Sequence, residues 1–484
     1  MLFNSLDFVI FLPVVFLLYW FVFNSNRKYQ NIFLVVASYV FYGWWDWRFL
    51  GLIVLSSLVD YFIGLKMADE VKGGKRKILL ILSLFVNLGI LIYFKYFNFF
   101  IESFVDAFTY FGITFKPSTL QIVLPVGISF YTFQTLSYSI DVYRRKLGPT
   151  KDIVSFFAYV SFFPQLVAGP IERAKHLLPQ FFKPRVFNYE IAVSGMRLTL
   201  WGFFQKIVIA DGCALYVNDI FTNYQSYSSP ILVLGAVLFS FQIYGDFAGY
   251  SNVAIGVSRL FGFDLMQNFK YPYFSRDIAE FWRRWHISLS TWFRDYLYIP
   301  LGGSRGSKII QVRNVFIIFI VSGFWHGANW TFIVWGALNA IFFLPLILLE
   351  KNRKYTVSLK DLGHVPDLKT LINVFATFTL TTFAWVFFRS NSIADAINYL
   401  KRIILNSDYT SLSSNSTMNN TIWPLFIFIG FFVTVEWLNR DSETVVSRFL
   451  LERKFMRYSF YFLIIILIII NINNEASGFI YFQF

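Results

Sequence analysis

The sequence predicts an all-α polytopic membrane protein, and three observations support this prediction. Only 14% of the 484 residues are charged and 56% are hydrophobic, whereas a soluble domain carries about 25% charged residues. The apolar residues form long blocks, such as residues 78–94 and 460–470, without the polar face of a helix that covers a soluble core. Aromatic residues reach 21% of the chain. So few charged side chains cannot cover a water-facing surface of this size.

Each helical crossing of a hydrocarbon core needs roughly 20 apolar residues. We expect such crossings near residues 7–23, 30–47, 49–65, 78–98, 194–210, 229–245, 309–325, 330–349, 371–388, 421–438 and 457–473. Residues 7–23 have no basic region before them and no small-residue cleavage site after them, so we expect a retained helix rather than a signal peptide. Glycine and proline interrupt the apolar region 119–170, which predicts re-entrant or broken helices there and about 11–13 membrane segments in all.

The charges of the connecting loops predict how the chain is oriented, because Lys and Arg concentrate in cytoplasmic loops. Basic residues gather at 27–28, 66–77, 144–146, 351–354 and 440–457, whereas the loop 211–230 has no Lys or Arg. We therefore expect both termini on the extracytoplasmic side, with Lys401 and Arg402 as the one discordant pair. The net charge of +14 is better explained by these loops than by nucleic-acid binding.

One segment, residues 262–313, does not resemble a membrane helix, because basic and aromatic side chains alternate along it. We expect short amphipathic helices at 277–287 and 289–298 and a turn at 301–303. The segment is compatible with a loop anchored at the headgroup surface. Alternatively, Arg283, Arg284 and Arg294 bind a phosphate-bearing donor such as coenzyme A, since guanidinium groups bind phosphate bidentately.

Two of the four histidines are candidates for chemistry. His326 lies between two strongly apolar runs, and His286 lies in the amphipathic segment. An ionisable residue near hydrocarbon is a candidate site, and a neutral imidazole can act as a general base. The alternative is a histidine bonded to the backbone of a short turn. We assign no chemistry to the remaining histidines, His176 and His364, which lie in hydrophilic connections.

The residues around His326 suggest how a substrate reaches it. Gly323 and Gly327 are expected to leave room beside the ring, and Asn329 is a candidate for orienting a carbonyl group or the imidazole. No Gly-x-Ser-x-Gly elbow is present. The single cysteine, Cys213, and the wide spacing of the histidines do not specify a metal site. A direct, histidine-assisted acyl transfer fits these residues.

Several motifs resemble those of the membrane-bound O-acyltransferase family, particularly its bacterial branch of alginate and peptidoglycan O-acetyltransferase subunits. The motifs are Pro125–Gln134, Phe163–Pro170, Asp246–Ser251, Phe281–Ser290 and Trp325–Trp330. The resemblance covers essentially the whole chain. It implies one integral-membrane domain: N-terminal spans (1–118), a core with both histidines (119–370) and C-terminal spans (371–484), arranged as a helical bundle around a transmembrane tunnel.

The resemblance also implies an activity. His326 matches the essential histidine of the family and His286 the second histidine of the bacterial branch. The expected reaction transfers an acetyl group from cytoplasmic acetyl-CoA, with no bound cofactor, across the bacterial cytoplasmic membrane. An extracytoplasmic acetyltransferase or esterase-like partner would then acetylate a polysaccharide such as alginate or peptidoglycan. D-alanyl transfer to teichoic acid is the alternative within the family.

The chain ends in a Phe-x-Tyr-x-x-Phe pattern, with Tyr481 at its centre. An aromatic anchor at the membrane interface is one explanation. The pattern also resembles the tail of bacterial acyl-transfer systems, in which the tyrosine carries the acyl group, and the loop charges place it outside. Because phenol is a poor nucleophile at a pKa of about 10, it needs a base, for which His326 is the candidate. A polysaccharide transporter or a scaffold subunit remains the non-enzymatic alternative, although we find no internal repeat typical of transporters.

Overall fold

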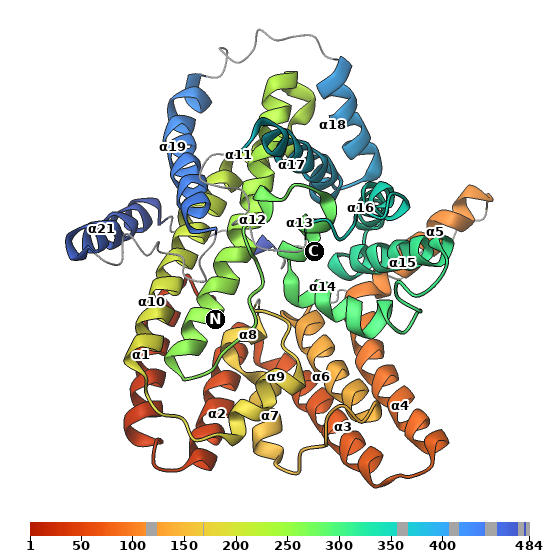
Figure 1. Ribbon diagram of the computed structural model, residues 1–484, viewed down its shortest axis with the longest axis vertical. Helices are drawn as coiled ribbons and strands as arrows, with labels where there is room; N and C mark the ends of the chain where they lie inside the picture. The colour runs from red at the N-terminus through yellow and green to blue at the C-terminus, as the bar shows by residue number, and fades with distance from the viewer. Residues whose placement is uncertain are drawn as a thin grey trace. The chain divides into compact units, whose positions relative to one another are not determined.

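A computed structural model describes residues 1–112, 123–167, 169–355, 366–405, 416–440, 453–472 and 479–480. All regular secondary structure in these ranges is helical (Figure 1). Nine helices in the described ranges are long and apolar enough to cross a membrane, and the shorter helix Leu6–Val22 is also apolar. The predicted fold class, an all-α polytopic membrane protein, is therefore confirmed.

Each predicted crossing falls on a helix and extends past the end of that helix by at most two residues, but several helices are longer than predicted, such as Gly73–Tyr110 and Ser229–Leu260. The stretches 30–47 and 49–65 join into one helical run, Arg27–Asp69, interrupted by the 3₁₀ turn Trp47–Phe49. The region with glycine and proline forms short helices instead of a single crossing: α6 (Ile128–Tyr143), α7 (Ile153–Ser161) and α8 (Phe163–Leu166). The prediction of broken helices in this region is thus also confirmed.

The chain divides into two compact units, of which the first comprises Met1–Ala192 and Val257–Met266. Besides α6 to α8, its helices are α1 (Leu6–Leu17), α2 (Arg27–Asp46), α3 (Leu50–Asp69), α4 (Gly73–Leu91), α5 (Phe97–Tyr110) and α9 (Ala174–Leu177). Helix α6 packs against both α3 and α4, and α2 packs against α7. This unit contains none of the residues that the sequence predicts to be functional.

A buried polar network joins three helices of the first unit. The carboxylate of Asp60 in α3 accepts hydrogen bonds from Ser83 and Asn87 (2.8 Å) of α4 and from Ser139 (2.7 Å) of α6. All four side chains are buried. Such hydrogen bonds stabilise the association of apolar helices in lipid, because an apolar helix face gains little by contacting another helix instead of lipid chains.

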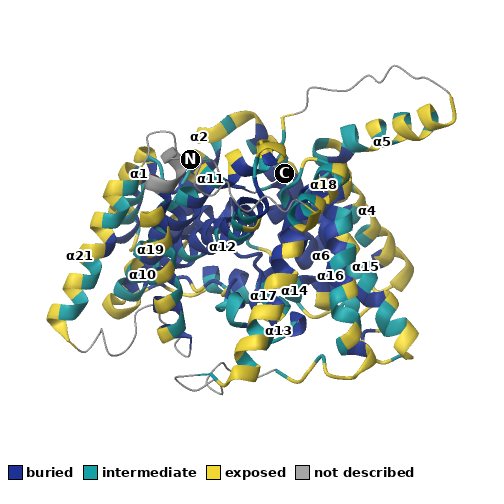
Figure 2. Ribbon diagram, turned by 90° about the horizontal axis from the view of Figure 1, so that it is seen from above, coloured by how far each residue is buried: buried dark blue, intermediate teal, exposed yellow. Residues whose placement is uncertain are grey.

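The second unit comprises Val193–Gly256 and Gln267–Phe484. Its helices are α10 (Tyr189–Phe203) and α12 (Ser229–Leu260), which each extend into the first unit at one end, then α11 (Asp211–Thr222), α13 (Ile278–Arg284), α14 (Ile287–Phe293), α15 (Lys308–His326), α16 (Trp330–Leu348), α17 (Leu368–Arg389), α18 (Ile393–Leu405), α19 (Ser416–Asn439) and α21 (Lys454–Asn471). Figure 2 shows α12 buried along most of its length, whereas α21 is largely exposed. Helix α12 therefore lies within the protein, and the exposed apolar face of α21 is suited to lipid.

Helices α15 and α16 form a tight hairpin (Figure 1). A Cβ atom on Gly323 would collide with the carbonyl oxygen of Phe332, and one on Gly327 would collide with the Phe332 ring. The expectation that these two glycines leave room for a substrate is therefore wrong. Phe332 fills that space, and the glycines instead allow the backbones of the hairpin to approach closely.

Candidate active site

The structure brings the two predicted histidines together in the second unit. His326 is the last residue of α15, and the centroid of its ring lies 6.4 Å from that of His286. Both side chains are almost fully buried, with 3% and 1% of their surface exposed. Forty residues separate them along the chain, so only the fold creates this pair. Of the remaining histidines, His176 lies in the first unit and bonds to Glu172 at 2.8 Å, and His364 lies outside the described residues.

Aromatic rings from three helices enclose His326. Its ring centroid lies 4.8 Å from Trp325 of α15, 5.1 Å from Trp335 of α16 and 5.4 Å from Phe388 of α17. Such a site excludes most water and leaves electrostatic interactions stronger than they are in solution. A proton transfer or a developing charge at this imidazole would therefore be strongly affected by its neighbours.

The backbone at His286 differs from the sequence-based expectation. A helix at 277–287 is wrong, because α13 ends at Arg284 and His286 adopts a left-handed conformation with φ 45° and ψ 54°. The cause is a distant segment: the Lys270 amide donates to the Arg284 carbonyl (2.9 Å), and the Ile287 amide donates to the Asn268 carbonyl (2.8 Å). A non-glycine residue in this region costs roughly 1–2 kcal/mol, so these contacts must hold it there.

His286 is a neutral imidazole in this environment. Burial lowers its pKa to about 3, and no charged neighbour contributes to that shift. Its Nδ1 atom lies 3.0 Å from Oδ1 of Asn268. At neutral pH the ring therefore carries one proton and one lone pair, as a hydrogen-bond acceptor or general base requires.

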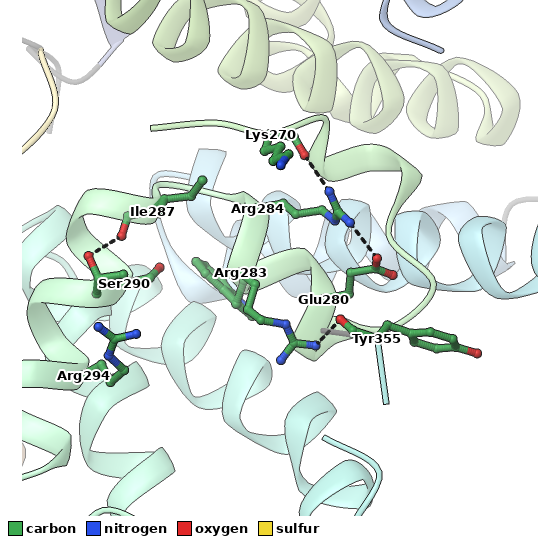
Figure 3. A pocket seen from close by; sticks show the side chains of 10 residues that line it. Lys270, Glu280, Arg283, Arg284, Ile287, Ser290, Arg294 and Tyr355 are labelled. Atoms are coloured by element: carbon green, nitrogen blue, oxygen red, sulfur yellow. Dashed lines mark hydrogen bonds and ion pairs between the residues drawn. The ribbon is translucent and has the colours of Figure 1, made fainter. Parts of the chain in front are cut away.

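A cavity of about 380 Å³ lies beside this segment (Figure 3). It is lined by Lys270, Glu280, Trp282, Arg283, Arg284, Ile287, Ser290, Thr291, Arg294 and Tyr355. All three arginines that the sequence predicts to bind a donor line it. Asn329, the fourth predicted residue, is not among the lining residues; it caps α16 through Thr331 (2.9 Å) and donates to the carbonyl of Asn391 (3.0 Å).

The cationic groups of the cavity differ in how far they are neutralised. Glu280 accepts from Arg284 at 2.9 Å, and Arg294 pairs with Asp295 at 2.8 Å. Arg283 instead donates to two backbone carbonyl oxygens, those of Asn352 and Tyr355, both at 3.0 Å, and Figure 3 shows the bond to Tyr355. Within the described part of the chain, no carboxylate oxygen lies within 4.0 Å of Arg283. Its charge, like that of Lys270, is not balanced by such a pair in the described ranges and is available for an anionic ligand.

A charged cluster that is not among the sequence-based predictions lies within membrane-spanning helices of the same unit. Lys206, in the π-helical turn Phe204–Ala210, contacts Asp211 and Asp246, both at 2.7 Å. Lys206 is 3% exposed. The position of Lys206 inside the predicted crossing 194–210 would have identified it, because an ionisable residue at membrane depth is a candidate functional residue.

The described end of the C-terminal tail contacts this cluster. The Ile480 amide donates to Oδ2 of Asp246 at 2.6 Å, and the buried ring of Phe479 lies 4.5 Å from Tyr250 and 5.9 Å from Phe247. Phe247 in turn contacts His286, with 4.6 Å between ring centroids. One aromatic ring therefore separates the tail from the histidine pair. Tyr481, the predicted acyl carrier, lies outside the described residues.

Comparison with known proteins identifies the family. A model of the membrane-bound O-acyltransferases matches residues 144–390, which include both histidines and the cationic cavity. The chain belongs to this family. As the sequence motifs predict, this membrane-bound O-acyltransferase is an enzyme and a multi-pass membrane protein.

Relatives within the family are similar over most of their length. The acyltransferase is 41% identical over 396 residues to a probable alginate O-acetylase of Pseudomonas syringae pv. tomato, covering 81% of this chain and 73% of the relative. It is 35% identical over 435 residues to a peptidoglycan O-acetyltransferase of Helicobacter pylori, covering 84% and 80%. A teichoic acid D-alanyltransferase of Bacillus subtilis is 30% identical over 244 residues, covering 48% and 61%. The acetyltransferases thus match much more of the chain.

Proposed function

We propose that this membrane-bound O-acyltransferase takes an acetyl group from cytoplasmic acetyl-CoA and delivers it to hydroxyl groups of an extracytoplasmic polysaccharide. The observation that carries the proposal is the pair of buried histidines beside a cationic cavity in one unit. The longer match to an alginate O-acetylase and a peptidoglycan O-acetyltransferase supports acetyl over D-alanyl as the acyl group. It also supports a cell-wall or extracellular polymer as the acceptor.

The cavity is proposed to hold the phosphate groups of the donor. Four cationic side chains and one carboxylate line it, and guanidinium groups bind phosphate with charge-assisted hydrogen bonds. His286 lies two residues after Arg284, and its ring contacts those of Trp325 and His326. A donor with its phosphates in the cavity would therefore extend its thioester toward the histidines.

Replacement of Arg283 by alanine tests the donor site. We expect KM for acetyl-CoA to rise about 10- to 150-fold with little change in kcat, since one charge-assisted contact to phosphate contributes about 1.5–3 kcal/mol. Steady-state kinetics of the purified enzyme in lipid nanodiscs gives both constants. Arg305→Ala is the matched control, because Arg305 is exposed and does not line the cavity. An unchanged KM in Arg283→Ala would place the donor elsewhere.

The acyl transfer is proposed to proceed through Tyr481. His326 takes the phenolic proton as the tyrosine oxygen attacks the thioester carbonyl; the new C–O bond forms, the C–S bond breaks, and the proton passes to the departing thiolate. A hydroxyl group of the acceptor then attacks the acyl-tyrosine, and the phenol regains its proton. The contacts of Phe479 and Ile480 with Asp246 and Phe247 support this route, since they bring the residue before Tyr481 close to the histidine site.

Mass spectrometry of the C-terminal peptide after incubation with acetyl-CoA tests the carrier. We expect an added acetyl group on Tyr481 in the wild-type enzyme and none in Tyr481→Phe, with transfer reduced by about 10²-fold or more because the covalent step is lost. Tyr458→Phe, which changes an exposed tyrosine of α21, is the matched control. Full transfer by Tyr481→Phe would refute the carrier while leaving the acyltransferase assignment intact.

The basic loops support an orientation with both termini on the extracytoplasmic side of a bacterial cytoplasmic membrane. In this orientation the acyl-tyrosine would face an extracytoplasmic acetyltransferase or esterase-like partner, which would place the acetyl group on the polysaccharide. The remaining alternative is D-alanyl transfer to teichoic acid. Incubation with acetyl-CoA alone separates the two, because a D-alanyltransferase would leave the tail unmodified under these conditions.

A further inference from the structure

Asn268 makes an extensive set of contacts with the segment that contains His286. Its side chain is fully buried, and Oδ1 lies 3.0 Å from His286 Nδ1. The same oxygen accepts from the hydroxyl of Ser288 (2.9 Å) and from the amide of Ser288 (3.4 Å), while Nδ2 donates to Ser251 (3.0 Å). The backbone carbonyl of Asn268 also accepts from the Ile287 amide. Asn268 therefore contacts the left-handed residue His286 itself and the two residues that follow it.

These contacts determine which way the amide of Asn268 faces. A backbone N–H group can only donate, so the atom of Asn268 that faces the Ser288 amide must be the acceptor oxygen. The reversed amide would place two donors opposite each other in a buried site, which costs about 1–3 kcal/mol or more. Because Oδ1 can only accept, the proton between it and His286 must belong to Nδ1 of the imidazole.

We propose that Asn268 is a positioning residue that fixes His286 as the tautomer protonated on Nδ1, so that Nε2 serves the reaction as a hydrogen-bond acceptor. Nε2 is buried and has no hydrogen-bond partner in the described ranges. In this state His286 binds a hydroxyl or amide N–H group of the substrate. It does not donate a hydrogen bond to the thioester carbonyl.

The surroundings of His286 leave Asn268 as the group that selects the tautomer. The rings in contact with it are Phe247, Phe269, Trp325 and His326, of which only His326 titrates. No carboxylate oxygen of the described chain lies within 4.0 Å of its nitrogens. In the serine-protease triad the corresponding task falls to a buried aspartate, and a wrong tautomer there lowers kcat by about 10⁴-fold.

Nitrogen NMR of the full-length enzyme with ¹⁵N-labelled histidine, in lipid and without substrate, tests the tautomer directly. The chain has four histidines, and His286→Gln assigns the signal of interest. We expect a neutral ring protonated on Nδ1 throughout pH 5–9 in the wild-type enzyme and in Ser251→Ala. In Asn268→Leu we expect a mixture or the Nε2-protonated form. A wild-type His286 protonated on Nε2, or on both nitrogens at pH 7, would overturn the proposal.

The catalytic consequence rests on the proposed function and has its own readout, the pH dependence of acetyl transfer. Asp at position 268 keeps the acceptor oxygen but adds a negative charge, which favours the imidazolium of His286. The pKa of His286 then rises, so that on acidification the ring becomes protonated at a higher pH than in the wild-type enzyme. The acidic limb of the kcat profile therefore moves to higher pH. We expect Asn268→Asp to stay within about tenfold of wild type at alkaline pH and to lose activity toward neutral pH.

The two measurements fail independently. If the NMR result holds but no variant of Asn268 changes the pH profile, His286 has the proposed tautomer but the proposed catalytic role is refuted. If acetyl-CoA is not a substrate at all, the profile cannot be recorded with that donor, and the NMR result still decides the positioning by Asn268. Aspartate has nearly the same shape as asparagine, so Asn268→Asp is expected to fold normally. A changed pH profile in this variant would then report a change in the protonation of His286 and not a loss of folded protein. Equal acidic limbs in Asn268→Asp and wild type would overturn the catalytic consequence of the positioning by Asn268.

Discussion

Replacement of His326 by alanine is expected to lower acetyl transfer by about 10²–10⁴-fold, the contribution of a general base to typical enzymatic reactions. The ring is buried among Trp325, Trp335 and Phe388, and no other described imidazole besides His286 contacts it. Neither tryptophan nor phenylalanine can take a proton, so among these neighbours only His286, 6.4 Å away between ring centroids, offers a substitute base. The measurement is the initial rate of acetyl transfer from radiolabelled acetyl-CoA by purified enzyme in nanodiscs.

His176→Ala is the matched control for this variant. His176 lies in the first unit and bonds to Glu172, so we expect its loss to change the rate less than about threefold. Thermal unfolding of both variants, followed by tryptophan fluorescence, identifies any loss of folded protein. A folded His326→Ala enzyme that retains one tenth or more of the wild-type rate would show that His326 is not the base.

Replacement of Lys206 by methionine is expected to have the largest effect on stability, a loss of about 3–5 kcal/mol. The ammonium group is 3% exposed and contacts Asp211 and Asp246, whose side chains are 20% and 3% exposed. Without it, the Asp246 carboxylate remains buried with no opposite charge in contact with it among the described residues. The same carboxylate accepts the Ile480 amide, so we also expect the tail to become more accessible to proteases. Chemical unfolding in mixed micelles measures the first effect and limited proteolysis the second.

A second substitution distinguishes lost charge balance from lost packing. In Lys206→Met combined with Asp246→Asn, the unbalanced charge is removed and the amide oxygen can still accept from Ile480, so at least half of the lost stability should return. Lys66→Met is the control, because Lys66 is exposed and its substitution should change stability by less than about 0.5 kcal/mol. If the double variant is no more stable than Lys206→Met, the cluster does not act through its charges.

The fold was largely predictable because the thickness of the membrane imposes one strong pattern on the chain. Each apolar run of the required length corresponds to a helix, and the interrupted region 119–170 contains the short helices that glycine and proline predict. What the sequence did not reveal is the arrangement of backbone around His286. The helical pattern of residues 277–287 continues through that position, and only the distant pairing with Asn268 and Lys270 breaks the helix.

The candidate site was predictable in its residue types but not in its geometry. His286 and His326 are unusual residues for their surroundings, which is why the sequence identifies both. Their proximity depends on α13 and α15 packing through aromatic rings that occur in almost every helix of the chain. The prediction for Gly323 and Gly327 is wrong for a related reason: a small residue beside a histidine can make room for a ligand or for another helix, and the sequence does not distinguish these cases.

The buried network of Asp60 has a consequence for the synthesis of the protein. Asp60 and its donor Ser139 lie 79 residues apart in sequence. At a synthesis rate of about 5–20 residues per second, Ser139 is therefore added about 4–16 s after Asp60. During this interval α3 is already present, and an aspartate at the centre of a membrane helix costs about 2.5–3.5 kcal/mol to insert. Pairing with Ser83 and Asn87 of α4 shortens the exposure of this carboxyl group to lipid. Early association of α3 with α4 is therefore expected to favour the membrane insertion of α3, well before the active site has been synthesised.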